Sequence, residues 1–382
     1  MTSAKRALTA FATVLLLTAG FMVLKPQTES SEATCNKTDS VILQLQWVTQ
    51  SQFAGYIAAD ALGYYDAACL DVQLVSSFFG NEPHRNLQAG NVDYAISWAP
   101  KAIIASQQGS ELTNVAQIFP RSGTVQLSLA SSNIEKVTDL VDTKVGTWGL
   151  DNGYELFAAL RKHRLSVEHH IELVPQSFDV TDLLVGNVDS MQAMIYNEVA
   201  QALSVVNPET GNLYTMADFN LLYWEDEAVD MLNDGIWVLA SNLLDDDFSE
   251  QTQRLVTASL EGWLYCRDNP TDCVDLVLAA GPLLGPAHQR YQLAEVNNLL
   301  WPNENGIGIV DVSQWQRTID VAVPEQSLSF FLPHESTDIN PLDFYDTAFV
   351  EAAHIDLKAR GYEDLTGATW TYEPVQVALS GN

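Results

Sequence analysis

Ring-bearing and amide-bearing side chains follow several apolar, β-rich stretches of this 382-residue chain. Trp47 and Trp148 each close such a stretch, Trp98 directly follows a third, and Tyr196-Asn197-Glu198 follows a fourth. Aromatic rings stack on flat heterocycles, and amides and carboxylates form directional hydrogen bonds to ring nitrogens or to an amine. The pattern predicts a slot for a small planar molecule. The candidate ligand-binding residues are Trp47, Phe53, Tyr56, Ser97, Trp98, Trp148, Asn152, Glu155, Tyr196, Asn197, Glu198 and Asp234.

These side chains also have structural alternatives. The three tryptophans end or follow apolar strands, where an indole ring is often part of the core. Phe53 and Tyr56 lie three residues apart on one predicted helix, so one can face a ligand while the other packs inward. Asp234, followed by Gly235, is most simply part of a turn, with a ligand contact as the alternative. A carboxylate in the slot selects against anions, which disfavours sulfonate or nitrate as the ligand.

Patterns typical of catalytic and metal sites are weak. The loop Gly149–Gly153 resembles a phosphate-binding loop, but no Lys-Ser/Thr pair follows it, which argues against nucleotide hydrolysis. The seven histidines, including His169-His170, show no metal-ligand spacing. No Ser-His-Asp or Cys-His arrangement stands out. We therefore expect no metal and no cofactor.

Alternating strands and helices must position the first group of candidates. Short β-rich segments are separated by helical segments, and the connections are short, which predicts a parallel sheet with helices on both faces. The expected strands are 41–47, 70–75, 94–97 and 115–119, and the expected helices are 53–62, 83–89 and 100–108.

A second α/β series begins near residue 144 and predicts a second lobe. Extended segments at 125–130 and 236–240 are expected to carry the chain out and back. The fold class is therefore α/β, with two lobes joined by two crossover strands. The expected division is residues 36–127 and 236–330 for lobe 1, 128–235 for lobe 2, and 331–382 for an acidic C-terminal extension. The expected elements of lobe 2 are strands 144–148, 170–175 and 190–195 with helices 154–161 and 180–185, and helices 250–266, 271–279, 288–298, 312–323 and 348–359 follow.

Composition excludes several partners. The chain has 49 Asp and Glu against 18 Lys and Arg, a formal net charge of −31, and 47% of its residues are apolar. Such a charge repels phosphate backbones and anionic lipid headgroups, so we expect no nucleic-acid partner. An acidic surface with few lysines is typical of proteins adapted to high salt, where screening weakens self-repulsion. We expect a monomer.

The N-terminal segment has the layout of an export signal. Lys5 and Arg6 precede an apolar run from Ala7 to Leu24, and a polar stretch follows. The segment 1–35 is expected to be a signal peptide, or an uncleaved anchor, with a polar spacer. Lipidation at Cys35 is a further alternative, although Glu32 occupies a position where lipoprotein signals carry an apolar residue. The expected location is the periplasm, or the outer side of the inner membrane with a tether.

Export makes disulfides the expected use of the four cysteines. Cys266 and Cys273 flank the turn-forming Asn269-Pro270 and can close a short loop, which leaves Cys35 and Cys69 for each other. No CxxC pair is present. Buried free thiols are the alternative.

Several of these segments together resemble one protein family. The segments Leu43–Trp47, Phe53–Tyr56, Gly63–Tyr65 and Leu70–Val72 are similar to the opening of ABC-importer substrate-binding proteins for thiamine-pyrimidine precursors and alkanesulfonates. The resemblance implies a type II periplasmic-binding-protein fold, with a small ligand held between the lobes and an ABC permease as partner. Two further stretches, Gly90–Ser97 and Val137–Gly146, resemble the same family.

The same family contains a eukaryotic pyrimidine synthase that uses iron and a sacrificial histidine. Its cysteine cluster falls on Met231–Leu239 here, where there is no cysteine, and its histidine falls on Lys101. Both differences argue against an enzyme. We expect an exported binding protein for a small planar nitrogen heterocycle similar to a thiamine pyrimidine precursor. The alternatives are a synthase-like enzyme, a membrane-anchored sensor, or a binder of a flavin or a sulfonate.

Overall fold

The computed structural model of the protein describes residues 35–377, apart from 79, 110 and 326–339. These residues belong to one compact unit. The expected signal peptide or anchor lies outside the described residues except for Cys35, and so does part of the expected C-terminal extension. Within the described part of the chain, no helix is both long enough and apolar enough to cross a membrane.

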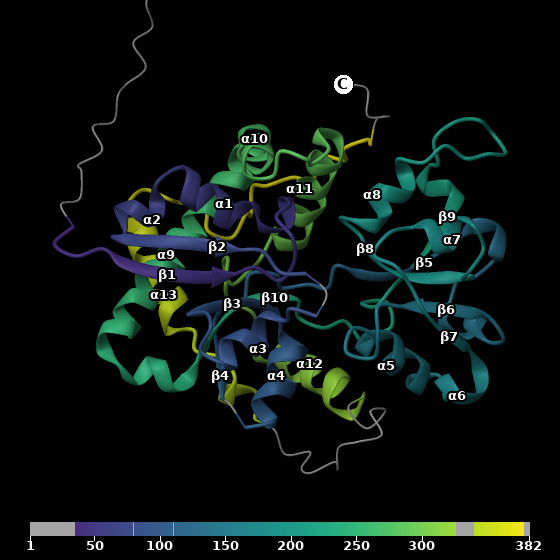
Figure 1. Cartoon of the computed structure of the whole chain (residues 1–382), viewed down its shortest axis with the longest axis horizontal. Coiled ribbons are helices and arrows are strands. Elements are labelled where there is room, and N and C mark those ends of the chain that lie inside the picture. The colour runs from purple at the N-terminus through teal and green to yellow at the C-terminus, as the bar shows by residue number, and fades with distance from the viewer. Residues whose placement is uncertain (1–34, 79, 110, 326–339, 378–382) are drawn as a thin grey trace, which may run out of the picture. The chain divides into compact units, whose positions relative to one another are not determined.

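Two five-stranded sheets organise this unit (Figure 1). The first has the order β2-β1-β3-β10-β4, and the second has the order β7-β6-β8-β5-β9. The first sheet contains β1 (Asp39–Gln44), β2 (Leu70–Val75), β3 (Tyr94–Trp98), β4 (Leu112–Ala116) and β10 (Asp234–Leu239). The second contains β5 (Thr124–Leu129), β6 (Lys144–Thr147), β7 (Glu172–Pro175), β8 (Ser190–Met194) and β9 (Phe219–Tyr223).

Helices cover both sheets (Figure 1). The N-terminal ones are α1 (Ala54–Ala61), α2 (Tyr64–Ala67), α3 (Pro83–Gln88), α4 (Ala99–Gln107), α5 (Tyr154–Lys162), α6 (Val167–His170), α7 (Thr181–Leu184) and α8 (Glu198–Leu203). The C-terminal ones are α9 (Asp246–Asp268), α10 (Pro270–Ala280), α11 (Pro286–Leu300), α12 (Val312–Glu325) and α13 (Ala348–Ala359). Short 3₁₀ turns span Ser51–Phe53, Ala130–Ser132, Val137–Leu140, Met216–Asp218, Ala240–Leu244 and Pro341–Asp343.

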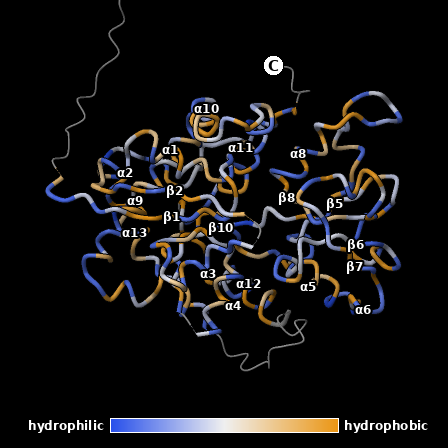
Figure 2. Tube along the Cα trace, viewed as in Figure 1, coloured by the Kyte–Doolittle hydropathy of each residue, from blue (hydrophilic) through white to orange (hydrophobic). Residues whose placement is uncertain are grey.

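Alternation along the strands of the first sheet builds two hydrophobic layers. Tyr94 and Ile96 of β3 join the cluster under α1 and α9, whereas Ala95 between them joins the cluster under α3, α4 and α12. Successive side chains of a strand point to opposite faces, so a fully buried strand serves both layers. Hydrophobic and hydrophilic residues accordingly alternate in short stretches along the chain (Figure 2).

A helix cap and a close glycine contact stabilise the hydrophobic layer under α1 and α9. Asp245 caps α9, since its side chain accepts hydrogen bonds from the backbone N–H groups of Asp247 and Phe248. A Cβ atom added at Gly262 of α9 would lie 2.0 Å from the Gly55 carbonyl oxygen of α1. Only glycine allows the two helices to approach this closely.

The fold class is confirmed, but the prediction of a parallel sheet is wrong in one respect. β1 pairs in parallel with β2 and β3, whereas β10 runs antiparallel between β3 and β4. The reason is that β10 returns from the second sheet and enters the first sheet from the opposite end. β5 is likewise antiparallel to β8 and β9.

The chain changes sheets just before the two expected crossover strands. The whole of β5 belongs to the second sheet and the whole of β10 to the first, so the predicted divisions at 127/128 and 235/236 fall inside strands. We propose instead that the lobe boundaries lie in the connecting segments 117–123 and 224–233. In the following, lobe 1 is built on the first sheet and lobe 2 on the second.

Both predicted disulfides are present. Cys35 bonds to Cys69 with a Cα–Cα distance of 5.6 Å, and Cys266 bonds to Cys273 with a distance of 5.1 Å. The first joins the start of the described chain to the residue before β2, and the second joins α9 to α10. Both disulfides lie in lobe 1.

The described part of the expected C-terminal extension packs on the rest of the unit. Tyr345 forms a bridge to Asn114 of β4, and α13 packs against α9. Further along, the Tyr372 hydroxyl donates to Glu295 of α11, and Val375 and Val377 pack against a cluster built mainly from lobe 2. Residues 340–377 therefore contribute to lobe 1 and reach the neighbourhood of lobe 2.

Candidate ligand-binding site

Six segments, each at or after the end of a strand, converge on one pocket between the two sheets. Three follow β1, β2 and β3 of lobe 1, and three follow β6, β7 and β8 of lobe 2, which places the pocket beyond the carboxyl ends of parallel strands. The pocket contains about 620 Å³ of empty space, part of it open to solvent. It is lined by Gln46, Trp47, Gln50, Gln52, Ser77, Phe78, Glu82, Trp98, Lys101, Trp148, Asn152, Phe178, Met194, Tyr196, Asn197 and Glu198.

Aromatic rings from the two lobes meet at this pocket. The Trp47 ring, after β1, lies 4.9 Å from the Phe178 ring, after β7, with an angle of 39° between their planes. On its own lobe, Phe178 lies nearly parallel to Trp148 at 12°, with the ring centroids 6.0 Å apart. Rings in this arrangement offer flat apolar faces to a planar molecule, and their meeting brings the lobes into contact.

A chain of amides connects the pocket to a buried carboxyl group. Gln50 Nε2 donates to Gln52 Oε1 at 2.8 Å, and Gln52 Nε2 donates to Asp234 Oδ2 at 2.8 Å. Burial raises the pKa of Asp234 to about 7, although the hydrogen bond from Gln52 acts in the opposite direction. Asp234 stands at the start of β10, where the chain re-enters lobe 1, so this amide chain links the pocket to the connection between the lobes.

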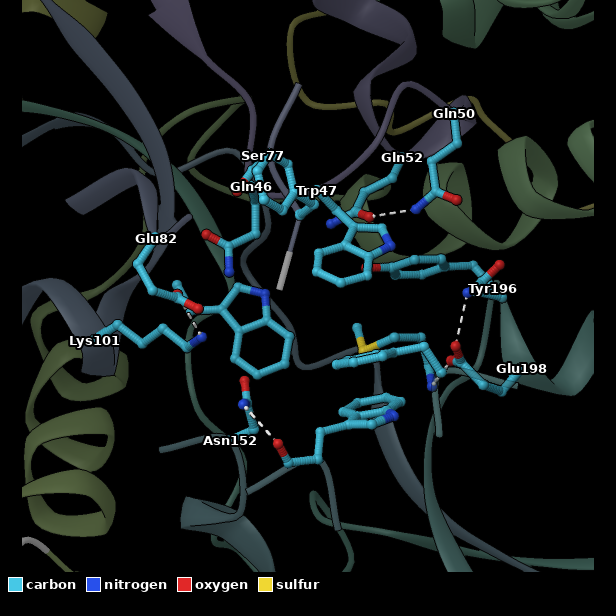
Figure 3. A pocket seen from close by; sticks show the side chains of 16 residues that line it. Gln46, Trp47, Gln50, Gln52, Ser77, Glu82, Lys101, Asn152, Tyr196 and Glu198 are labelled. Atoms are coloured by element: carbon cyan, nitrogen blue, oxygen red, sulfur yellow. Dashed lines mark hydrogen bonds and ion pairs between the residues drawn. The ribbon is translucent and has the colours of Figure 1, made fainter. Parts of the chain in front are cut away.

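The lobe 1 wall of the pocket carries an ion pair. Lys101 Nζ lies 3.1 Å from Glu82 Oε2 and 5.5 Å from the centroid of the Trp98 ring. Figure 3 shows Lys101, Glu82 and Gln46 on one side of the pocket. Within the described residues, the buried Gln46 Oε1 atom has no hydrogen-bond partner, whereas the Trp98 side chain interacts with the Asp234 carboxyl group. This wall therefore combines a charge pair with an open acceptor.

Two polar side chains of the lobe 2 wall, Asn197 and Glu198, are bonded to the protein itself. Glu198 accepts hydrogen bonds from the Met194 backbone N–H at 2.8 Å and from Asn197 Nδ2 at 2.7 Å. Burial raises the pKa of Glu198 to about 7, and these bonds limit the rise. Asn197 Oδ1 also lies 2.9 Å from His288 Nε2 of α11. These bonds hold the start of α8 in place beside the pocket.

Comparison with known proteins identifies the family. The profile described as NMT1/THI5 like matches residues 50–273, which is more than half of the chain. The chain belongs to the NMT1/THI5-like family. It is 26% identical over 289 residues to the Riboflavin-binding protein RibY of Chloroflexus aurantiacus, and the match covers 73% of this chain and 78% of that protein.

Two further similarities bear on this family member. The Formylaminopyrimidine-binding protein of Halalkalibacterium halodurans is 20% identical over 293 residues, which cover 74% of this chain and 84% of that protein. The structure of a putative periplasmic sulfonate-binding protein, SsuA from Methylobacillus flagellatus, superposes with a TM-score of 0.61 at 15% identity, over 89% of this chain and 99% of that one. At this identity the structural match establishes the two-lobed fold.

In this NMT1/THI5-like protein, seven of the twelve candidate residues line the pocket. All seven come directly after a strand or within a few residues of its end, as expected for a parallel α/β sheet. They are Trp47, Trp98, Trp148, Asn152, Tyr196, Asn197 and Glu198.

Phe53 and Tyr56 lie outside the pocket lining, in the core of lobe 1. Both are almost fully buried, and the Tyr56 ring meets Trp263 of α9 edge-on at 5.6 Å and 83°. The expectation that one of the two faces the ligand assumed that one side of their helix is open. That side is closed because α9 packs tightly on α1.

Ser97, Glu155 and Asp234 also lie outside the lining. Ser97 is buried in the middle of the first sheet, where its carbonyl oxygen accepts from the Trp237 indole. Glu155 accepts hydrogen bonds from the Thr124 hydroxyl and, at 3.0 Å, from the Met231 backbone N–H, and burial raises its pKa well above the usual value. It thus ties α5 to the first residue of β5 and to the last part of the connecting segment 224–233. Asp234 reaches the pocket through Gln52.

Nine lining residues were not among the sequence candidates. Gln50 and Gln52 fall between the expected strand 41–47 and the expected helix 53–62, and Lys101 was noted only for its position relative to the synthase histidine. Phe178 follows β7, just as Trp47 and Trp148 follow their strands. The same strand-end rule, applied to every predicted strand, would have identified Phe178. The nine are Gln46, Gln50, Gln52, Ser77, Phe78, Glu82, Lys101, Phe178 and Met194.

Proposed function

We propose that this protein is an exported solute-binding protein of an ABC importer. It captures a small planar nitrogen heterocycle between its two lobes and delivers it, as a monomer, to a permease in the membrane. One observation carries this proposal: aromatic and amide side chains from both lobes line a single pocket beyond the strand ends.

The pocket has the properties of a small-molecule site. It combines the apolar faces of aromatic rings with a few polar groups, which is the usual lining of such sites. A stacked aromatic pair contributes about 0.5–1.5 kcal/mol beyond the burial of its area. Because a ligand touches both walls only when the lobes are close, its binding favours the closed arrangement over the open one.

The relatives support the chemical class of the ligand. Two of them are named for riboflavin and for formylaminopyrimidine, and both molecules contain planar nitrogen heterocycles. An alkanesulfonate suits the site less well, since two carboxyl groups, Glu82 and Glu198, stand against one lysine in the lining. We therefore assign the site to an uncharged or weakly charged ring and not to an anion.

Residues in and near the pocket favour binding over catalysis. The returning segment Met231–Leu239 contains no cysteine, and Lys101 is held in an ion pair by Glu82. Asp234 and Glu198 are both engaged by neighbouring amide groups. Export is supported by the disulfides, because such bonds persist in oxidising compartments.

A ligand panel tests the proposal directly. Thermal unfolding of the purified protein is followed with riboflavin, 4-amino-5-hydroxymethyl-2-methylpyrimidine, ethanesulfonate and a mixture of amino acids. We expect the melting temperature to rise with one or both heterocycles and to stay unchanged with the others, because binding to the native state alone stabilises it. Stabilisation confined to ethanesulfonate or amino acids would contradict the proposal.

A further inference from the structure

We infer that His288 is a positioning residue for ligand binding and that it acts through Asn197. From α11 of lobe 1, His288 holds a side chain that lines the pocket on lobe 2, so one hydrogen bond fastens the two lobes beside the ligand. The inference rests on the proposed function, because it assigns the retention of the ligand in part to a residue outside the pocket lining.

α11 is fixed to lobe 1. It packs against α10 and against the 3₁₀ turn Ser51–Phe53. Gln289 Oε1 accepts a hydrogen bond from the Ser51 backbone N–H at 2.7 Å. Gln50 and Gln52, on either side of Ser51, both line the pocket. Since His288 directly precedes Gln289, its position is tied to the lobe 1 wall of the pocket.

One face of α11 is turned towards lobe 2, where it meets α8 (Figure 1). His288, Tyr291 and Glu295 are spaced by three and four residues, which places them on the same side of the helix. Tyr291 is part of the hydrophobic cluster built mainly from lobe 2. Glu295 accepts a hydrogen bond from Tyr372, in the segment that continues to the same cluster. This face of α11 therefore belongs to the contact between the lobes.

His288 and Asn197 form a directed hydrogen bond across this contact. His288 Nε2 lies 2.9 Å from Asn197 Oδ1, and an amide oxygen only accepts, so the histidine donates from Nε2. Burial lowers the pKa of His288, so the ring is neutral near pH 7. Asn197 Nδ2 donates in turn to Glu198 Oε1 at 2.7 Å. Both ends of the Asn197 amide are therefore held, and one of the two bonds comes from the other lobe.

A bond between the lobes acts on the equilibrium between open and closed arrangements. It breaks when the lobes separate, so it stabilises the closed arrangement alone. A ligand held between the two walls leaves when the lobes open, so loss of the bond should speed its dissociation. The apparent affinity should fall with the population of the closed arrangement. His288 thus acts on the ligand without lining the pocket.

The affinity and the dissociation rate of the ligand test this role. The probes are riboflavin, followed by stopped-flow fluorescence, and 4-amino-5-hydroxymethyl-2-methylpyrimidine, followed by isothermal titration calorimetry. His288→Ala removes the donor and should weaken binding of whichever probe the wild type binds by about five- to tenfold. For riboflavin, the change should lie mainly in faster dissociation. His288→Gln keeps a side-chain N–H donor and should stay within about threefold of the wild type.

A double-mutant cycle shows whether His288 acts through Asn197. Asn197→Ala removes the partner, so H288A should weaken binding by less than about twofold further in that background. His354→Ala is the matched control. This half-buried histidine also bonds through Nε2, at 2.8 Å, but to the Ile307 carbonyl oxygen within lobe 1. Its loss should reduce stability and leave the affinity for both probes unchanged.

The outcomes separate this inference from the proposed function. Wild-type affinity in H288A, or effects of H288A and N197A that simply add, would overturn the role of His288 and leave the proposed function intact. If the wild type binds neither probe, the proposed function fails, and small-angle X-ray scattering of the ligand-free protein then decides whether His288 links the lobes. H288A should have a larger radius of gyration than the wild type, and an equal radius would overturn the link.

Discussion

The two walls of the pocket contribute rings alike but treat their polar groups differently. In lobe 2, Glu198 and Asn197 are bonded to the Met194 backbone, to each other and to His288. In lobe 1, Gln46 Oε1 is buried and has no partner within the described residues. We therefore propose that both lobes supply rings for stacking on a ligand, whereas lobe 1 supplies the open acceptor.

The lobes also differ in covalent support, and removing it has the largest expected effect. The Cys35–Cys69 bond closes a loop across a sequence separation of 34, so Cys35→Ser with Cys69→Ser should lower the free energy of unfolding by about 4 kcal/mol. The Cys266–Cys273 bond, with a separation of 7, should contribute about 2.5 kcal/mol when tested by the same double substitution. Urea denaturation followed by circular dichroism measures both. A larger loss for the shorter loop would contradict the loop-closure argument.

Protonation of two buried carboxyl groups, one in each lobe, gives an effect of comparable size. Burial raises the pKa of Asp234 and of Glu198 to about 7, whereas carboxyl groups of the unfolded chain titrate near pH 4. Between these values the native protein binds more protons than the unfolded chain. The free energy of unfolding should therefore fall as the pH rises from about 4 to about 7, by about 1.4 kcal/mol per pH unit for each group.

Asp234→Asn should remove one of these two contributions. Relative to the wild type, the variant should gain stability as the pH rises from about 4.5 to about 7.5, as measured by urea denaturation across that range. Asp343→Asn, at an exposed position, serves as the control. A stability difference between variant and wild type that does not change with pH would show that Asp234 keeps its ordinary pKa.

Loss of a lobe 2 ring should reduce affinity more than stability. Trp148→Ala removes the ring that lies parallel to Phe178 and should weaken riboflavin binding by about 30-fold, which corresponds to about 2 kcal/mol. Fluorescence titration with riboflavin measures the change. Tyr214→Ala, which removes an aromatic contact with Phe219 on the same lobe, should leave affinity unchanged. Unfolding of the Trp148 variant would instead identify this ring as part of the core.

The smallest effect is expected for the ring that bridges the lobes. Phe178→Ala removes the 4.9 Å contact with Trp47 and should shift the protein towards more open arrangements. We expect a larger radius of gyration by small-angle X-ray scattering and an affinity for riboflavin about fivefold lower. An unchanged radius in the absence of ligand would show that this contact does not hold the lobes together.

The sequence was sufficient to locate the pocket but not to complete its lining. The rule that ligands lie beyond strand ends identified Trp47 and Trp148, because it needs only the strand order along the chain. Phe53 and Tyr56 follow the same strand, yet their side chains are buried because Gly262 lets α9 pack closely on α1. That contact joins segments about two hundred residues apart, and no local pattern reveals it.

Long-range placement explains the other differences as well. β9 (Phe219–Tyr223) was not predicted, since its strand character depends on pairing with β5. β10 lies antiparallel inside the first sheet because the chain returns there from the other lobe. The strand itself was visible in the sequence, but its direction and its neighbours were not. Lys101 could have been recognised from its position in a first helical turn, where a basic residue is unfavourable.

Hydrogen exchange with and without saturating riboflavin decides whether a ligand contacts both lobes, because it reports protection segment by segment. We expect added protection in two sets of segments at once: 46–52, 77–82 and 98–101 of lobe 1, and 148–152, 176–178 and 194–198 of lobe 2. Protection in only one lobe, or at a surface away from these loops, would contradict a ligand held between the two walls.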